Sequence, residues 1–402
     1  SAEQGTAGTW LIDPYNIEIV SGPAYTQYSD SHLNGFSNVG AGNGDYAWNG
    51  TSYVFVGIGM GDYEAWSDYH YNFYPIYNMN NSTDAAGHQH GSTWSSTWSS
   101  YVDYWLADNG GSSVNYSPKD LFASGYGSTI SAEYISQALS GGSTVRVMTG
   151  MTGSAGTDAG NITVNGAIAN SSGTLELIAA NDITINSAIS VNGLDLIAGG
   201  NVSQSLSGII TANTLDLNVT GNVILNQANA IQNVQGAVGG DLNLRTTTAL
   251  GQGDVLSVGL QTTLQSEGAI TLNNANNDFG GALSVVGTAG NDVAIQDQND
   301  LTLGSIANMD DLTLVASENV VFTGTVAADA ITVRADASIT QVDGAVITAT
   351  SMDVGGATVG AVQRVDLSAA ENAIGTVSGD VSASLRVRNG NSALTIGNAF
   401  AV

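Results

Sequence analysis

Short apolar segments that alternate with polar residues repeat along most of the chain. Alternation with a period of two is typical of half-buried β-strands. The Asn, Asp or Gly that follows each segment favours a turn. The pattern therefore predicts many short strands joined by tight corners. Examples are NITVNGAI at 161–168, TLELIAANDITINSAI at 174–189, LDLIAGGNVSQ at 194–204 and LDLNVTGNVILN at 215–226.

The strands recur at a nearly fixed spacing. Leu175, Leu194 and Leu215 follow one another at steps of 19 and 21. A second series, Ile162, Ile183, Val202 and Val223, has steps of 21, 19 and 21. A period near 20 without a helix between the strands indicates a β-solenoid, whose rungs stack about 4.8 Å apart. We therefore predict an all-β parallel β-helix with rungs of about 20 residues.

A segment of different composition separates the first strand from these repeats. The stretch 9–20 has strand character around a single Asp-Pro turn, and comparable strands resume only near Ser128. All six Trp and all four His fall within residues 1–118, and all fifteen Tyr fall within residues 1–134. We predict a first rung at 1–21, an aromatic-rich insertion projecting from the shaft at 22–127, and the β-helix shaft at 128–402.

Two segments have helical periodicity. In STISAEYISQALSGG at 128–142, Ile135, Ala138 and Leu139 share one helix face, which predicts a short packing helix. Within the insertion, Trp94, Trp98, Tyr101 and Trp105 follow one another at steps of four, three and four. This spacing predicts a helix from near Ser92 to Asn109 whose aromatic face either binds sugar rings or packs against the shaft.

Three segments follow one another in order: GTWLIDPYNIEI, ISAEYISQALSGGSTVRVMTG and GNITVNGAIANSSGTLELIAANDITINSAI. Together they resemble the module of bacterial two-partner secretion exoproteins of the filamentous haemagglutinin and large-adhesin type. The match is specific over 8–21 and 128–200 and general beyond them. It implies a right-handed parallel β-helix in which the first strand lies beside the segment from Ser128. It also implies a secreted, extracellular protein of the bacterial cell surface, without catalysis in the shaft.

Charge and composition exclude several classes of partner. Only 7 Lys and Arg oppose 35 Asp and Glu, and the formal net charge is −28. Such a surface repels phosphate backbones and anionic lipids, so we predict no binding to nucleic acid. No apolar stretch approaches the length typical of a membrane span, about 18 residues, which predicts no membrane insertion. The absence of Cys excludes disulfides and thiolate metal sites.

Candidate metal ligands are few. Asp84, His88 and His90 form a D-x-x-x-H-x-H pattern that can chelate a metal through two imidazoles, or that makes ordinary surface hydrogen bonds. Calcium at Asp- and Asn-rich corners, such as 80–84, 291–292 and 297–300, is compatible with oxygen ligands but lacks a diagnostic loop. No other cofactor is predicted.

The distribution of charged residues favours a scaffold over an enzyme. Polysaccharide-degrading β-helices need a cluster of acidic and basic groups, whereas the seven cations of this chain are spread thinly. Arg364, Asp366, Arg386 and Arg388 fall about one period apart, and ion pairs between adjacent strands explain them. We predict a non-enzymatic structural or adhesive protein whose insertion binds a surface glycan or a host or neighbour protein. Capture of haem or a haemoprotein by the histidines of the insertion is the alternative.

The ends of the sequence raise the question of assembly. The first rung begins close to the N-terminus, with Thr9 and Trp10, and LTIGNAFAV keeps strand character to the last residue. Unpaired edges template pairing with another chain, so the expectation is head-to-tail stacking of copies into filaments. The competing expectation is that the chain is an excerpt of a longer polypeptide. The net charge opposes stacking, and screening salt or divalent cations should promote it.

Overall fold

The computed structural model describes residues 16–21, 128–149, 159–358 and 360–397, together with six short strands between residues 44 and 122. The chain forms two compact units, Ser1–Ile209 and Ile210–Val402. In both units, the strands that succeed one another along the repeats pair in parallel, as in a β-solenoid. The predicted all-β parallel β-helix is thereby confirmed. The described part of the chain contains no helix that is both long enough and apolar enough to cross a membrane.

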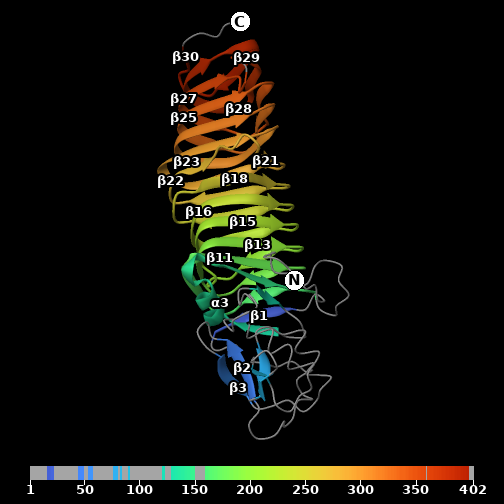
Figure 1. Cartoon of the computed structure of the whole chain (residues 1–402). Helices are drawn as coiled ribbons and strands as arrows, with labels where there is room; N and C mark the ends of the chain where they lie inside the picture. Colours follow the sequence, from blue (N-terminus) through green and yellow to red (C-terminus); the bar gives the residue numbers. More distant parts are fainter. Residues whose placement is uncertain are drawn as a thin grey trace. The chain divides into compact units, whose positions relative to one another are not determined.

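The first unit combines the start of the solenoid with a short helix (Figure 1). Its elements are β1 (Ile17–Val20), β2 (Gly44–Trp48), β3 (Tyr53–Gly57), β4 (Ile76–Met79), β5 (Ser82–Thr83), β6 (Gln89–His90), β7 (Asp120–Phe122), β8 (Ser128–Ser131), α3 (Ala132–Ala138), the 3-10 turn η3 (Ser140–Gly142), β9 (Thr144–Met148), β10 (Ile162–Val164), β11 (Ile168–Ala179), β12 (Ile183–Ile185), β13 (Ile189–Ala198) and β14 (Val202–Gln204).

Strand β1 joins two strands that are distant from it in the sequence. It pairs in parallel with β8, where Ile17 lies opposite Ser128, and with β10, where Ile17 lies opposite Ile162. The backbone of Val20 passes so close to Gly166 that a Cβ at this glycine would overlap it. The first strand therefore lies beside the segment from Ser128, as the resemblance implied.

Helix α3 is shorter than the predicted segment, because residues 128–131 form strand β8 and residues 140–142 form η3. Ile135 and Leu139 are fully buried, as their spacing predicted. The helix is tied to β11 through Ser136, whose hydroxyl accepts the N–H of Ala169 at 3.0 Å. The carbonyl oxygen of Ser136 also accepts a bond of 2.8 Å from the side chain of Asn170. These contacts make α3 a packing helix on the flank of the first unit.

The strands between residues 44 and 90 pair differently from those of the solenoid. Strand β2 pairs antiparallel with β3 and β4, and β5 pairs antiparallel with β6. Strand β7 pairs in parallel with β9, with Asp120 opposite Arg146. Part of the predicted 22–127 insertion is thus a strand of the solenoid sheet. The boundaries predicted for the insertion stay a prediction, because most of 22–127 lies outside the described residues.

The second unit is a continuous series of solenoid strands, whose layers are visible in Figure 1. They are β15 (Ile210–Val219), β16 (Val223–Val238), β17 (Leu242–Thr246), β18 (Gly251–Val258), β19 (Thr262–Ser266), β20 (Ile270–Leu272), β21 (Asp278–Phe279), β22 (Leu283–Asp297), β23 (Leu301–Ala316), β24 (Asn319–Phe322), β25 (Val326–Ala335), β26 (Ser338–Gln341), β27 (Ile347–Gly355), β28 (Val362–Gly379), β29 (Val381–Asn389) and β30 (Thr395–Ile396).

The register of the strands reproduces the period read from the sequence. In the first unit, Ile162 lies opposite Ile183, which lies opposite Val202, at steps of 21 and 19. In the second unit, Leu242 lies opposite Thr262, which lies opposite Leu283, at steps of 20 and 21. Residues that face inward on one rung therefore stack on the inward residues of the next.

The core consists of these inward ladders of Leu, Ile and Val. Burial alternates along the strands, as in β12, where Ile183 and Ile185 are buried and Thr184 between them is half-buried. The largest fully buried side chains include Phe279 and Phe322. Burying each large apolar side chain contributes about 1.5–3 kcal/mol, so the repeated ladders supply most of the stabilisation.

Thr262 breaks the apolar ladder between Leu242 and Leu283. It is fully buried, and its hydroxyl has no hydrogen-bond partner among the described residues. Thr262→Val keeps the shape and removes the unsatisfied hydroxyl, so we expect the free energy of unfolding to rise by about 1 kcal/mol. Urea unfolding followed by circular dichroism measures this change. Thr262→Ser, which keeps the hydroxyl and deletes a methyl group, should destabilise the protein instead.

Candidate functional site

Most of the predicted site residues lie outside the described residues. These are Trp94, Trp98, Tyr101 and Trp105 of the aromatic face, and Asp84 and His88 of the metal pattern. The backbone of His90 ends strand β6, where it lies opposite Ser82. Both the aromatic site and the histidine site therefore stay predictions. Among the polar side chains that the structure does place, two sets bond one rung of the solenoid to the next.

One set of polar side chains lies at the start of successive strands, and we call it the outer corner residues. They are Asn161, Asp182, Asn222, Asp241 and Asp300. Each side-chain oxygen accepts the backbone N–H of a residue about one rung further along the chain. The bond from Asn201 to Asp182 is 2.7 Å long, and that from Asn319 to Asp300 is 3.0 Å. These ladders confirm that Asn and Asp form the corners.

A second set of polar side chains is buried, and these side chains bond to the preceding rung instead of the following one. We call these the inner capping residues: Asn229, Thr246, Asn277, Asp297 and Asn372. Each accepts the backbone N–H of a residue on the preceding rung, at 2.8 to 3.0 Å. A buried N–H without a partner is destabilising, so these side chains satisfy groups that the strand ladders leave open.

Two of the inner capping residues form paired amides. Asn372 accepts a bond of 2.6 Å from Nε2 of Gln341 and returns one of 3.2 Å to its Oε1. Asn277 and Gln252 make the same reciprocal contact, with a bond of 3.2 Å from Asn277 Nδ2 to Gln252 Oε1. Both pairs are missing from the sequence-based prediction. The signal that could have found them is an amide at a position where the repeat places an apolar side chain.

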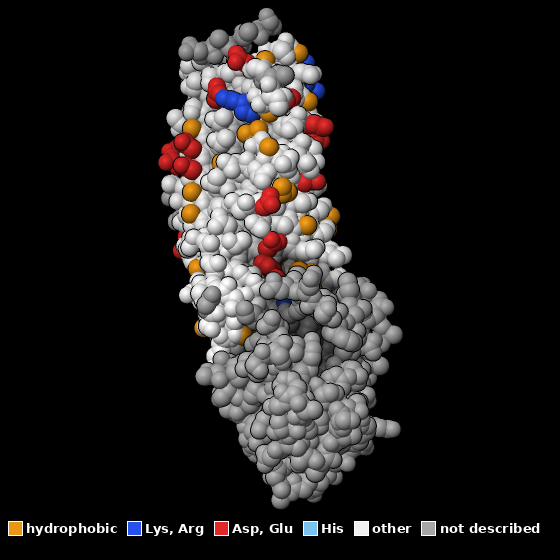
Figure 2. Space-filling model, in the orientation of Figure 1, with side chains coloured by type: hydrophobic (Ala, Val, Ile, Leu, Met, Phe, Trp, Pro, Cys, Tyr) orange, Lys and Arg blue, Asp and Glu red, His pale blue; other side chains and the backbone are white. Residues whose placement is uncertain are grey.

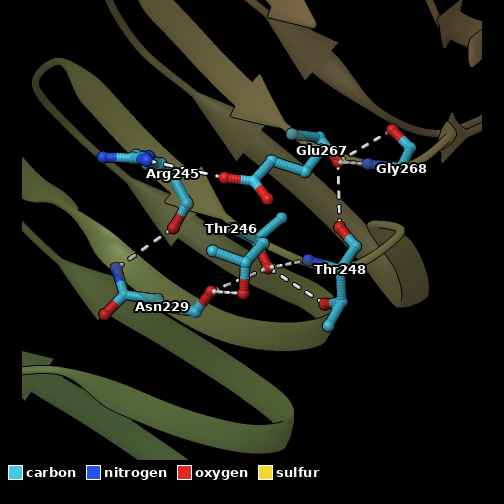
Figure 3. A network of polar contacts seen from close by, with 8 residues as sticks. Asn229, Arg245, Thr246, Thr248, Glu267 and Gly268 are labelled. Carbon is cyan, nitrogen blue, oxygen red and sulfur yellow. Dashed lines mark hydrogen bonds and ion pairs between the residues drawn. The ribbon is translucent and has the colours of Figure 1, made fainter. Parts of the chain in front are cut away.

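Figure 3 shows how these contacts continue from rung to rung around Asn229. Its Nδ2 donates to the carbonyl oxygen of Arg245 at 3.1 Å, and the Thr246 hydroxyl lies 3.0 Å from that of Thr248. The guanidinium of Arg245 lies 3.5 Å from the carboxylate of Glu267. The network links consecutive rungs through backbone and side-chain atoms, which is a structural arrangement.

Asp297 is the ionisable member of the inner capping residues. It is fully buried, and its two carboxylate oxygens accept the N–H groups of Phe279 and Asn299, each at 2.9 Å. Burial raises the pKa of Asp297 to about 6, and the nearby carboxylates of Asp278 and Asp300 add to the rise. Both oxygens thus point at N–H donors, an orientation that does not favour the calcium site proposed for 297–300.

Metal binding finds no further support within the residues that the structure describes. They contain no group of three or more His, Asp or Glu side chains that could hold a metal ion. Of the other two calcium positions, 80–84 lies mostly outside the described residues. The position at 291–292 includes Asp292, whose carboxylate accepts the N–H of Asp311 at 3.3 Å. This bond makes Asp292 a further link between rungs.

Every arginine of the described residues has a carboxylate partner. The pairs are Arg146 with Glu176, Arg245 with Glu267, Arg334 with Asp353, Arg364 and Arg386 with Asp366, and Arg388 with Glu371. Asp366 lies opposite Arg386 on the next strand, which confirms the predicted ion pairs between adjacent strands. The hydroxyl of Ser368 and the guanidinium of Arg364 hold the pKa of Asp366 below its usual value.

Part of the chain matches a known family of repeats. Residues 172–235 and 220–286 match a family described as repeats of unknown function (DUF5649). The chain is similar to these repeats. No curated protein and no solved structure matches it. The matched residues include members of both the outer corner residues and the inner capping residues, so the similarity concerns the repeat architecture. The description of the family gives no activity.

The surface of the shaft is polar without being highly charged. Figure 2 shows that, on the visible face, the described residues expose mainly neutral polar side chains and backbone, with separate carboxylates and scattered hydrophobic side chains. Charged residues make up only 10% of the chain. The described corner residues and ion pairs connect neighbouring rungs and neighbouring strands.

Proposed function

We propose that this protein is a non-enzymatic structural and adhesive element of a bacterial cell surface. The solenoid acts as the scaffold, and the aromatic-rich segment at 22–127 makes the specific contacts. The observation that carries the proposal is that polar side chains of the shaft bond to other groups of the shaft. The described arginines pair with carboxylates, and the inner capping residues bond the backbone of the preceding rung. These groups are thereby occupied in holding the rungs together.

The extracellular location and the adhesive role are supported by the sequence resemblance to two-partner secretion exoproteins. The contrast in aromatic content adds to this support, because all six Trp lie within residues 1–118. Aromatic side chains supply much of the recognition energy at binding surfaces. The shaft has few such side chains with which to recognise a ligand.

Binding to a glycan array tests the contact part of the proposal. We expect the wild-type chain to bind a defined set of glycans, and Trp94→Ala/Trp98→Ala to lose at least about 10-fold in affinity, because each sugar ring stacks on an aromatic face. Leu206→Ser is the matched control, since Leu206 is 83% exposed on the described shaft and should leave binding unchanged. Circular dichroism checks that both variants are folded.

Two outcomes contradict this part of the proposal. One is equal binding by the wild type and the Trp94→Ala/Trp98→Ala variant. This result would indicate that the aromatic face packs against the shaft. The other is an absence of glycan binding together with a Soret band on addition of haem, which would favour haem capture. Neither outcome changes the scaffold role, which rests on the described contacts of the shaft.

Self-association is the remaining part of the proposal. The bonds that join one rung to the next within the chain can equally join rungs of two chains, which would give a heterologous, non-closing contact. The net charge of −28 opposes association at low ionic strength. We therefore expect filaments in negative-stain images at high salt with calcium. Uniformly single particles under these conditions would contradict self-association.

A further inference from the structure

Strand β1 is held on both sides by strands from a remote part of the sequence (Figure 1). It lies between β8, which begins at Ser128, and β10, which begins at Ile162, and it runs parallel to both. By contrast, β10 and β12 pair at a step of 21, with Ile162 opposite Ile183. The middle strand of this part of the sheet therefore comes from a segment that is separated from its neighbours by residues 21–127.

The space between β8 and β10, which we call the β1 slot, fits its strand closely. Ile17 and Ile19 are fully buried in it. The N–H of Ile17 donates to the carbonyl oxygen of Asn161 at 2.8 Å. The carbonyl oxygen of Ile19 accepts the N–H groups of Asn165 and Gly166 at 2.7 and 2.8 Å. The slot thus recognises both the backbone and the apolar side chains of β1.

Polar side chains on and beside β1 add to this recognition. The side-chain oxygen of Asn16 accepts the N–H of Asn161 at 2.8 Å. The carboxylate of Glu18 accepts a bond of 2.5 Å from Nδ2 of Asn165. All these contacts are non-covalent and join residues 16–20 to strands beyond residue 127. A β1 that belongs to another copy of the chain would offer the same contacts.

Without β1, the slot would expose strand edges and apolar side chains. Among the described strands, β8 and β10 each pair with β1 and not with each other. Adjacent strands lie about 4.8 Å apart, so β8 and β10 are about 9.6 Å apart, too far for bonds between their backbones. Ile130 and Ile162 are buried register partners of β1 and would lose this neighbour. Unpaired edges of this kind bind an extended strand.

We propose that the β1 slot accepts β1 of a second copy of this chain, so that copies are joined by exchange of this strand. The entropy lost in closing a connection grows with its length, and residues 21–127 must be closed when β1 enters the slot of its own chain. This cost weakens the preference for the strand of the same chain. The contact differs from the stacking of whole rungs, because one strand within the sheet changes chains.

Disulfide cross-linking between differently tagged full-length chains tests the exchange, because the natural sequence has no Cys. One chain carries Glu18→Cys and the other carries Thr163→Cys. These residues lie opposite each other on adjacent strands, within reach of a disulfide. The chains are unfolded in urea, refolded together at several protein concentrations and oxidised. We expect a mixed disulfide whose yield rises with protein concentration.

Thr184→Cys is the matched control for Thr163→Cys. Thr184 lies opposite Thr163 on the next strand, about 9.6 Å from Glu18, which exceeds the span of a disulfide. Its mixed disulfide with Glu18→Cys should form in at least about 10-fold lower yield. Equal yields from the two positions would overturn the proposal, because they would indicate random collisions. Absence of the mixed disulfide at every concentration would overturn it as well.

Ile19→Asp should have opposite effects in the two chains, because a charge at this buried position prevents β1 from entering the slot. In the chain with Glu18→Cys, it should lower the yield at least about 10-fold. In the chain with Thr163→Cys, it should raise the yield by emptying the slot. If this second variant fails to fold, the first decides, since its partner keeps an unaltered slot. An unchanged yield in the first would overturn the proposal.

A single chain that carries both Glu18→Cys and Thr163→Cys provides a further measurement. Its disulfide forms within the chain when β1 occupies its own slot and between chains when β1 is exchanged. We expect the share of the interchain product to rise with protein concentration during refolding. Only the intrachain product at every concentration would overturn the proposal.

Discussion

Gly236→Ala is expected to lower the free energy of unfolding by about 3 kcal/mol or more. Gly236 lies within β16, opposite Leu217 of the preceding rung and Leu256 of the next. Its φ is +104°, and a Cβ there would overlap the carbonyl oxygen of Leu217. Alanine must therefore adopt a strained backbone conformation and also push apart two hydrogen-bonded rungs. Urea unfolding followed by circular dichroism measures the loss.

Substitutions at two other glycines separate the cost of backbone strain from the cost of the steric overlap. Gly290 has a φ of +87° and no heavy atom within 4 Å of the position of a Cβ, so Gly290→Ala should cost only about 1 kcal/mol of backbone strain. Gly360 also has open space around it and a φ outside the left-handed region, so Gly360→Ala should be neutral. A loss for Gly236→Ala no larger than that for Gly290→Ala would show that the close approach of Leu217 is unimportant.

Asn372→Ala is expected to cost about 3–5 kcal/mol, because it removes several buried hydrogen bonds at once. The side-chain oxygen of Asn372 accepts the N–H of Ile347 at 2.9 Å, and its Nδ2 donates to the carbonyl oxygens of Leu367 and Arg388 at 2.9 and 3.1 Å. Alanine leaves these groups, together with the amide of Gln341, without this partner. Urea denaturation at constant pH gives the size of the effect.

A double-mutant cycle with Gln341→Ala tests whether the two amides act as a pair. We expect the double variant to lose at least about 1 kcal/mol less than the two single variants together, because the first substitution already breaks the reciprocal contact. Asn186→Ala is the control, since it removes only an exposed bond to Asn165 and should change stability by less than about 0.5 kcal/mol. Strict additivity of the two buried variants would contradict a coupled pair.

The spacing of apolar residues was enough to predict the fold and much of the register. Leu175 lies opposite Leu194, and Ile183 lies opposite Val202, as the period near 20 indicated. The reason is that strand side chains alternate between two faces, so a one-residue slip would turn an entire ladder outward. The ion pair between Asp366 and Arg386 on the neighbouring strand followed from the same period. The aromatic and histidine sites were predicted from local spacing alone, and they lie at residues the structure does not describe.

By itself, the sequence determined the solenoid, its period and the use of Asn and Asp at the corners. Only the tertiary structure decided which of these polar residues are buried and what they bond. Asp297 and Asp300 are close neighbours in the sequence, yet one is fully buried and the other makes an exposed bond to Asn319. Rung length also varies, since Ile339 lies opposite Val365 at a step of 26, and this longer step precedes the pairing of Gln341 with Asn372. Burial and pairing depend on where the neighbouring rungs place their backbone, and the residue type alone does not contain that information.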